Sequence, residues 1–305
     1  MDDQNVEGAE PASSAKSGPT PSRMSSLAWS AAAAGEWVAV PGEDSDKYRR
    51  GVLGVVTGSA RYPGAAVLGV EAAVRTGLGM VRYIGDQRAA DFVLHRRPEV
   101  VTASGRVQAW LLGSGMDAES RGDEATSRLR DALAQAVPAV VDAGALDLIA
   151  DAVGPVIVTP HYRELARVMK SHGVDCSVDE ISARPARWAR QAARILNVTV
   201  LLKGHATQVA SPEGEQIVVQ LAPTWLATAG SGDVLAGILG ALVATHAESI
   251  DADGHGALVR LGASAAAIHG LAAERASAGG PIAALDVAEA VPATIAALLA
   301  ASSSS

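Results

Sequence analysis

Aromatic residues and cysteine are scarce in this sequence, which restricts the composition of the core and the kinds of covalent or metal cross-link. Phe, Trp and Tyr make up 3% of the 305 residues while 49% are hydrophobic, so Ala, Val, Leu and Ile must build the core. That composition suits helices packed closely on a parallel sheet. The single cysteine, Cys176, excludes an internal disulfide framework and a cysteine-rich metal site, and it is consistent with a reducing cytoplasm.

Basic residues are outnumbered by acidic ones, which restricts the ligands to be expected. The formal net charge of -8 argues against a general surface for nucleic acid or anionic membranes. An anionic ligand therefore needs a local site. We expect no stretch apolar enough to cross a membrane, and the acidic N-terminus does not resemble a secretion signal. The sequence thus predicts a cytoplasmic protein without nucleic-acid or membrane partners.

Low-complexity ends flank one expected domain. Ser, Pro, Gly and Ala dominate residues 1–24, which contain almost no large apolar side chain to offset the entropy of ordering. We therefore expect a disordered leader at 1–24, a single domain at 25–301 and a frayed tail at 302–305.

Strand patterns alternate with helix patterns from residue 52 onwards. Strands are expected at 52–57, 80–84, 108–112, 139–142, 156–159 and 199–203, and a hairpin at 208–220. Helices are expected at 65–75, 121–136, 162–170, 185–196, 233–245, 256–276 and 287–299. This order predicts an α/β fold with a doubly wound, mainly parallel sheet flanked by helices. Ligands of such folds bind outside the carboxyl ends of the strands.

The most informative stretch is 225–240, WLATAGSGDVLAGILG, in which a glycine-serine turn delivers Asp233 to the start of an apolar helix. Free N–H groups at a helix start form an anion site, which here comprises Ala229, Gly230, Ser231 and Gly232. A carboxylate beside an anion makes sense if it takes a proton from a hydroxyl while the N–H groups stabilise a transferring phosphoryl group. The alternative is that Ser231 or Asp233 only caps the helix. The spacing matches neither the dinucleotide fingerprint nor a Walker A loop.

This turn resembles the GTGD-type anion hole of the ribokinase-like superfamily, and other stretches are similar to the NAD(P)H-hydrate dehydratases within it. Residues 47–66, KYRRGVLGVVTGSARYPGAA, resemble the opening of that family. The sequence at 112–116, LGSGM, resembles its GPG loop, with Ser114 where proline is usual. Residues 158–164, VTPHYRE, resemble TPHxxE, and 202–207, LKGHAT, resemble KGxxT.

The resemblance implies roles for individual residues. Asp233 is the implied catalytic base, and the substrate contacts are Ala65, Ala66, Gly115, His161 and Asp233. The nucleotide contacts, besides the glycine turn, are Lys203, Gly204, His205, Ala206 and Thr207. No residue is assigned as a metal ligand.

Structural alternatives accompany these roles. The alanines can simply pack a helix on the sheet, His161 can be structural, and Lys203 can be a surface residue that ends a strand. The family's strand-end aspartate is present as Asp142 in the segment DAGAL. That carboxylate could help hold a magnesium-water shell, but we expect it to cap the next helix.

The implied activity is the ADP- or ATP-dependent dehydration of (S)-NADHX and (S)-NADPHX, in which water has added across the ring C5=C6 bond. The C6 hydroxyl is first phosphorylated with Mg²⁺ present, and the phosphate then leaves. The resemblance also implies a cytoplasmic homo-oligomer, of which a tetramer is one form. The epimerase domain frequent in the family is absent, so we expect a stand-alone bacterial dehydratase.

Two other functions are kept as alternatives. A ribokinase-like kinase of a vitamin precursor or sugar would use the same turn and stop at the phosphorylated product, although the TPH and GAA matches argue against it. A non-catalytic nucleotide-binding regulator would have no need of Asp233. The preferences for ADP or ATP, and for NADHX or NADPHX, stay open.

Overall fold

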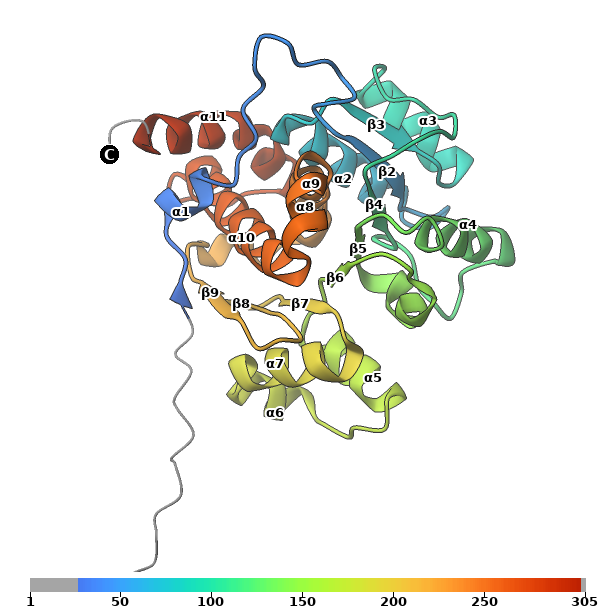
Figure 1. The fold of residues 1–305 in the computed structure, drawn as a ribbon, viewed down its shortest axis with the longest axis vertical. Helices are drawn as coiled ribbons and strands as arrows, with labels where there is room; N and C mark the ends of the chain where they lie inside the picture. The colour runs from blue at the N-terminus through green and yellow to red at the C-terminus, as the bar shows by residue number, and fades with distance from the viewer. Residues whose placement is uncertain (1–26, 303–305) are drawn as a thin grey trace, which may run out of the picture.

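One sheet organises the computed structural model, which describes residues 27–302. Its nine strands lie in the order β1-β9-β8-β7-β6-β5-β4-β2-β3 (Figure 1). The strands are β1 (Leu27–Ala28), β2 (Val52–Val56), β3 (Met80–Tyr83), β4 (Ala109–Leu112), β5 (Ala139–Val141), β6 (Val156–Val158), β7 (Thr199–Leu202), β8 (Thr207–Ala210) and β9 (Gln216–Val219). Neighbouring strands are parallel except in the β7–β8 and β8–β9 pairs, which are antiparallel.

Helices cover both faces of the sheet. On one side lie α1 (Ala31–Gly35), α2 (Pro63–Thr76), α3 (Gln87–Arg96), α8 (Ser231–Thr245), α9 (Ala247–Asp253), α10 (His255–Ser277) and α11 (Ala284–Ser302). On the other lie α4 (Asp123–Leu133), the 3₁₀ helix η1 (Ala143–Asp151), α5 (Tyr162–Ser171), α6 (Val178–Ala183) and α7 (Pro185–Leu196). A short 3₁₀ helix, η2 (Thr224–Leu226), precedes α8.

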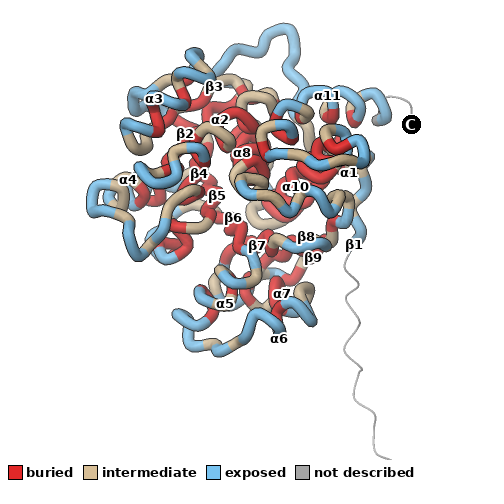
Figure 2. Tube along the Cα trace, turned by 180° about the vertical axis from the view of Figure 1, so that it is seen from behind, coloured by how far each residue is buried: buried red, intermediate tan, exposed pale blue. Residues whose placement is uncertain are grey.

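The central strands are buried on both faces, as a doubly wound sheet requires (Figure 2). In β2, Leu53 and Val55 join the core beneath α2, α8 and α10, whereas Val52 and Val56 join the core beneath α4 to α7. This division follows from the two-residue period of a strand.

Helix α8 lies in the middle of its layer, and every residue from Val234 to Ala244 is buried. Its Gly237 packs against the backbone of α2, where an added Cβ would lie 2.1 Å from the carbonyl oxygen of Gly69. A helix apolar on all sides can be accommodated only inside the protein. Since α8 has no freedom to shift, the residues at its N-terminus hold a fixed position.

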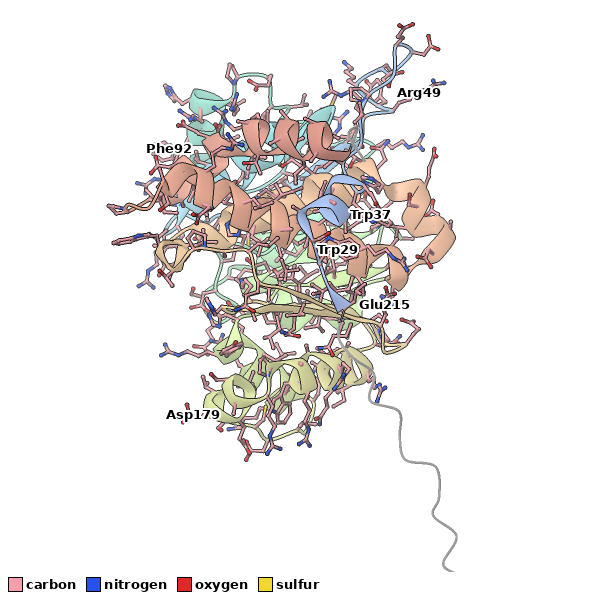
Figure 3. All side chains as sticks on the ribbon, turned by 90° about the vertical axis from the view of Figure 1, so that its left-hand side faces the viewer. Trp29, Trp37, Arg49, Phe92, Asp179 and Glu215 are labelled. Carbon is pink, nitrogen blue, oxygen red and sulfur yellow. The ribbon has the colours of Figure 1, made fainter. Side chains whose placement is uncertain are left out.

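The segment around α1 closes one edge of the molecule. Strand β1 pairs with β9, and Trp29 donates a hydrogen bond of 3.2 Å to Ser264 in α10. Trp37 follows α1, with its ring 5.8 Å from that of His246 (Figure 3). The chain before β2 is therefore tied to the fold from residue 27 onwards.

The predicted fold class is confirmed, and each predicted strand and helix coincides with an observed one to within a few residues. The 208–220 hairpin is present as β8 and β9. Strand β1 and the helices α1, α3, α6 and α9 were not predicted. The predicted leader at 1–24 lies outside the described residues, as does the tail apart from Ser302, which ends α11.

The expectation that no stretch is apolar enough to cross a membrane is wrong by length and composition. The stretches His255–Ser277 and Ala284–Ala301 reach mean hydropathies of 1.3 and 1.6 over 18 residues. In the first, 83% of that window is buried inside the protein, whereas in the second the share is 33%. The first helix attains such hydropathy because it packs against apolar neighbours on most sides, which the second does not.

Candidate active site

A glycine turn starts α8 and places Asp233 in its first turn. Gly230 is the N-cap residue at φ 87°, a left-handed conformation that glycine adopts at little cost. A Cβ there would lie 2.5 Å from Leu68 Cδ1, so a larger residue would also clash. Within the described chain, the N–H groups of Gly232 and Asp233 have no backbone acceptor. The turn therefore presents free donors and one carboxylate at the same point.

The Asp233 carboxylate does not cap its helix. Among the described residues its hydrogen-bond partner is the Ser114 hydroxyl, which donates to Oδ1 from the loop after β4. The alternative that Ser231 or Asp233 is the N-cap is wrong, because Gly230 holds that position. Burial raises the pKa of Asp233, and the hydrogen bond from Ser114 opposes that rise. The carboxylate is thus a partly buried proton acceptor with a fixed orientation.

Lys203, at the end of β7, brings a positive charge to the same place. Its Nζ lies 2.9 Å from Asp142 Oδ1 and 3.8 Å from Glu164 Oε2. Its side chain is 19% exposed, so the alternative of a surface lysine is wrong. Burial alone would lower the pKa of Lys203, but the two carboxylates outweigh burial and raise it, which keeps the ammonium charged. A Cβ on Gly232 would lie 3.6 Å from Nζ, which places the ammonium beside the glycine turn.

Asp142 holds Lys203 in position. Its Oδ1 also accepts a hydrogen bond of 2.7 Å from the Thr159 hydroxyl, so a single carboxylate oxygen joins the ends of β5, β6 and β7. Asp142 occupies the N-cap position of η1 but makes no capping hydrogen bond there, so the expectation that its side chain caps the helix is wrong. The buried ammonium attracts the carboxylate away from the helix.

His161 is the N-cap residue of α5. Its Nδ1 accepts a hydrogen bond of 3.1 Å from the Glu164 N–H, and the Glu164 carboxylate accepts one of 2.8 Å from the His161 N–H. This is a capping box with histidine in the usual place of serine or threonine. The ring is half exposed, so it can contact a ligand while it caps the helix. His161 therefore has the structural role that was the alternative, and its substrate contact stays a prediction.

A cavity of about 450 Å³ opens beside the glycine turn, and we call it the nucleotide-side pocket. Six of the residues with predicted nucleotide roles line it, namely Lys203, Gly204, His205, Thr207, Ser231 and Gly232. The other three, Ala206, Ala229 and Gly230, are absent from its lining within the described chain. Residues of β9, η2, α8 and α10 complete the wall.

His269 of α10 also lines the nucleotide-side pocket. Its Nε2 is buried without a hydrogen-bond partner among the described residues. Burial lowers the pKa of His269 to about 4, against a hydrogen bond with the Ser231 backbone. The ring is therefore neutral near pH 7 and adds no charge to this pocket.

Three of the predicted substrate residues, Ala65, Ala66 and Gly115, lie beside the loop that carries Ser114. Gly115 follows Ser114, and a Cβ on it would lie 2.3 Å from the Cβ of Ala65. Ala66 is fully buried beneath Gly58, which supports packing as its function. Asp233, Ser114, Gly115 and Ala65 thus lie in one continuous series of contacts, whereas His161 lies on the β6 side near Lys203.

Residues 53–292, which are most of the chain, match the family model described as NAD(P)H-hydrate dehydratase. The chain belongs to this dehydratase family. It is 37% identical over 221 residues to the ADP-dependent (S)-NAD(P)H-hydrate dehydratase of Neisseria meningitidis, an alignment that covers 66% of this chain and 72% of that protein.

A longer relative is the bifunctional NAD(P)H-hydrate repair enzyme Nnr of Mycobacterium tuberculosis. It is 43% identical over 225 residues, which are 70% of this chain and 45% of that protein. The chain therefore spans less than half the length of these bifunctional relatives.

A solved structure shares the fold. The ADP/ATP-dependent NAD(P)H-hydrate dehydratase of Bacillus subtilis, co-crystallized with ATP/Mg²⁺, superposes with a TM-score of 0.76 at 24% identity. The match covers 90% of this chain and 99% of that chain. The ribokinase-like fold predicted from the sequence is thus confirmed for this member of the dehydratase family.

Two residues of this dehydratase-family site, Ser114 and His269, were not assigned roles from the sequence. Ser114 was noted only as a departure from the family's proline, yet its hydroxyl binds Asp233. His269 was not assigned any role, although a histidine in the alanine-rich middle of a helix is a signal that could have been followed. The two residues come from distant parts of the chain.

Proposed function

We propose that this chain restores NADH and NADPH from (S)-NADHX and (S)-NADPHX, with ADP or ATP as the phosphate donor. The observation that carries the proposal is the position of Asp233, beside the free N–H groups of α8 and the charged Lys203. The printed name of the Neisseria relative, an ADP-dependent (S)-NAD(P)H-hydrate dehydratase, supports the same reaction.

In the first step Asp233 takes the proton of the C6 hydroxyl, and the oxygen attacks the terminal phosphorus of the donor. The donor leaves with one phosphate fewer. Donors at the start of α8 and the ammonium of Lys203 stabilise the charge on the transferring group. Burial favours the role of Asp233 as a base, because it raises the pKa of Asp233 and hence its affinity for a proton.

In the second step phosphate departs from C6, pushed by the lone pair of the ring nitrogen. Loss of a proton from C5 then restores the C5=C6 double bond. Hydroxide is a poor leaving group whereas phosphate is a good one, so the first step exists to make the second fast. A kinase of this fold would end after the first step.

The site suits magnesium that arrives with the nucleotide. Among the described residues no cluster of three or more His, Cys, Asp and Glu could hold a metal. Mg²⁺ commonly keeps several waters and binds through substrate phosphates plus one or two carboxylates. Asp142 and Glu164, beside Lys203, are the carboxylates that would face it, and the metal would neutralise phosphate charge.

The proposal also covers the binding site of the donor, the cellular compartment and the assembly. The nucleotide-side pocket takes the phosphate donor, with its phosphates toward Ser231 and Gly232. The protein acts in the cytoplasm on these small molecules and assembles as a homo-oligomer, as the family resemblance implies.

The test supplies purified protein with NADH hydrate, magnesium and either ADP or ATP, and follows the absorbance of reduced nicotinamide. We expect recovery of NADH with at least one donor and none without a donor. Phosphorylated hydrate that accumulates without NADH would favour the kinase alternative. No reaction with either donor would contradict the proposal.

A further inference from the structure

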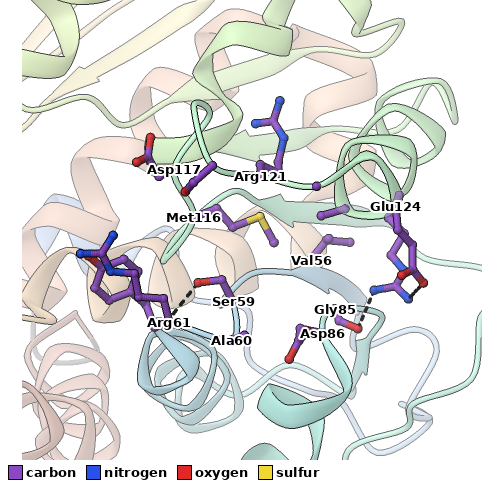
Figure 4. Close-up of a pocket in the computed structure, with 16 residues that line it drawn as sticks. Val56, Ser59, Ala60, Arg61, Gly85, Asp86, Met116, Asp117, Arg121 and Glu124 are labelled. Carbon is purple, nitrogen blue, oxygen red and sulfur yellow. Dashed lines mark hydrogen bonds and ion pairs between the residues drawn. The ribbon is translucent and has the colours of Figure 1, made fainter.

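A second cavity, here called the distal pocket, lies at the carboxyl ends of β2, β3 and β4 (Figure 4). Its volume is about 430 Å³, close to that of the nucleotide-side pocket. Its walls include Ser59, Arg61, Asp86, Met116, Ala125 and Arg128. Each pocket is large enough for a nucleotide-sized group.

The distal pocket is connected to Asp233 through the loop after β4. Ser114, which binds Asp233, accepts a hydrogen bond of 2.7 Å from the Gly58 N–H through its carbonyl. The Ser59 hydroxyl donates a hydrogen bond of 3.0 Å to the carbonyl of Gly115. Gly58, Ser59 and Met116 all line the pocket, so its inner wall begins one or two residues from the contact with Asp233.

The proposed reaction needs both ligands at once, and only the nicotinamide ring of the hydrate reacts at Asp233. The phosphate donor occupies the nucleotide-side pocket. The larger remainder of the hydrate is an adenosine diphosphate group, which must lie elsewhere along the same edge of the sheet. The distal pocket adjoins the loop of Ser114 and Gly115, which contacts Asp233.

The charges around the distal pocket favour an anion at its rim. Asp86 is occupied as the N-cap of α3, where it accepts a hydrogen bond of 2.9 Å from the Arg88 N–H, and Glu124 is paired with Arg128. The Asp117 carboxylate, which also lines the pocket, accepts a hydrogen bond of 3.2 Å from the Glu119 N–H. Arg61 lies over the Tyr62 ring, 5.3 Å from its centroid. The Arg88 side chain reaches the Ala60 carbonyl at 3.5 Å.

Neither Arg61 nor Arg88 has a carboxylate partner among the described residues. Two unpaired guanidinium groups at one rim suit a diphosphate, because arginine binds phosphate oxygens through paired donors.

We propose that the distal pocket binds the adenosine diphosphate half of the hydrated dinucleotide, with Arg61 and Arg88 near its phosphates. The inference rests on the proposed function, because it assigns the part of that substrate which does not react. Binding energy from a remote part of a substrate can be used at the reacting ring, so this pocket would raise the efficiency of dehydration.

The experiment compares two hydrates with the same reacting ring, those of NADH and of reduced nicotinamide mononucleotide, which lacks the adenylate half. For the unchanged protein we expect kcat/KM to be at least about tenfold higher for the dinucleotide, or ~1.4 kcal/mol. Ala125→Trp fills the cavity and should lower kcat/KM for the dinucleotide alone. Arg61→Gln removes a rim charge and should lower kcat/KM more for the dinucleotide than for the mononucleotide, which keeps only one of the two phosphates.

Arg194→Gln is the matched control, because Arg194 is an exposed arginine on α7, remote from the cavity lining. It should leave both values unchanged, and melting temperatures should show that all variants fold. Equal efficiency with both hydrates, or equal losses in the Ala125→Trp protein, would overturn the inference while the proposed function survives. If neither hydrate is dehydrated, the proposed function fails and the inference fails with it.

Discussion

Among single residues, Ser114 determines the orientation of the Asp233 carboxylate through its hydroxyl. The serine is almost fully buried, and its side chain comes from a loop 119 residues away in sequence. The hydrogen bond orients one carboxylate oxygen and lowers the pKa of Asp233, while burial raises it. The positive charge of Lys203 also opposes the rise in the pKa of Asp233 that burial causes.

Ser114→Ala should therefore move the acidic limb of the pH profile of kcat/KM to higher pH. Without the donor, burial acts unopposed by this bond, so the pKa of Asp233 rises and protonation begins at a higher pH. Ser114→Thr retains a hydroxyl and is the control. An acidic limb that stays in place in the alanine variant would show that Ser114 does not tune the base.

His161 combines a capping role with a predicted substrate contact, and two substitutions separate them. His161→Ala removes the cap of α5 and should lower the free energy of unfolding by about 1 kcal/mol. His161→Asn can still cap the helix and should keep most of the stability. Both variants should weaken hydrate binding more than nucleotide binding. Equal losses for both ligands would mean that the turn is only structural.

The contacts between side chains far apart in the sequence were the part of the site that could not be predicted. The strand ends and the glycine turn were predicted, because their motifs are local. The pairing of Lys203 with Asp142 and of Ser114 with Asp233 depends on which loops meet at the sheet edge. The Asp142 cap was predicted wrongly for the same reason, since a buried ammonium from β7 competes for the carboxylate.

At the scale of elements, a buried carboxylate joins three helices. Glu71 of α2 has a side chain with no exposed surface, and it receives hydrogen bonds from Arg75, Arg96 and Arg97. Arg96 also pairs with Glu289, which links α3 to α11. Burial would raise the pKa of Glu71, but the arginines outweigh it and lower the pKa to about 2.

Glu71→Gln should lower the free energy of unfolding by about 3 kcal/mol at neutral pH, because three partly buried guanidinium groups lose the charge partner that they share. The folded-state pKa lies below the ordinary value of 4.5, so the unfolded chain binds the proton more readily. The contribution is present above about pH 4.5 and is lost as pH falls toward 2. Urea unfolding across this range should therefore depend less on pH in the variant.

The matched control is Glu289→Gln, since Glu289 belongs to the same network but its side chain is 46% exposed. We expect a change of less than about 1 kcal/mol from it. Equal destabilisation by both substitutions would contradict the account of Glu71 as the centre of the network.

Most helices and strands could be predicted from the local sequence pattern. Those that were not predicted were missed for different reasons. Helix α6 begins with a capping box of Ser177 and Glu180, a signal present in the sequence that could have identified it. Helix α9 has only Ile250 buried, so no apolar periodicity marks it. Strand β1 is two residues long and exists because β9 offers a free edge, which is a property of the sheet.

At the scale of the whole molecule, the fold class was predictable because strands and helices alternate in the sequence. The membrane prediction failed at two helices, of which α10 owes its apolar composition to burial within the protein whereas α11 is mostly unburied. The distal pocket was not predicted either, since its walls come from three separate loops and α4.

Assembly remains a prediction at this scale. The family resemblance implies a homo-oligomer, and α11 leaves much of its apolar length outside the core. Light scattering at micromolar concentration should give a mass of at least two chains. A monomer under those conditions would contradict the prediction without affecting the assignment of the site.

Asp233→Asn is the measurement that tests the central claim most directly. Asparagine has nearly the same shape but cannot take a proton from the substrate hydroxyl near neutral pH. The dehydration rate should fall by about 10²–10⁴, while melting temperature and nucleotide affinity stay close to those of the unchanged protein. Rate, affinity and melting temperature are to be measured on the same preparation. A fall of less than about tenfold would show that Asp233 is not the base.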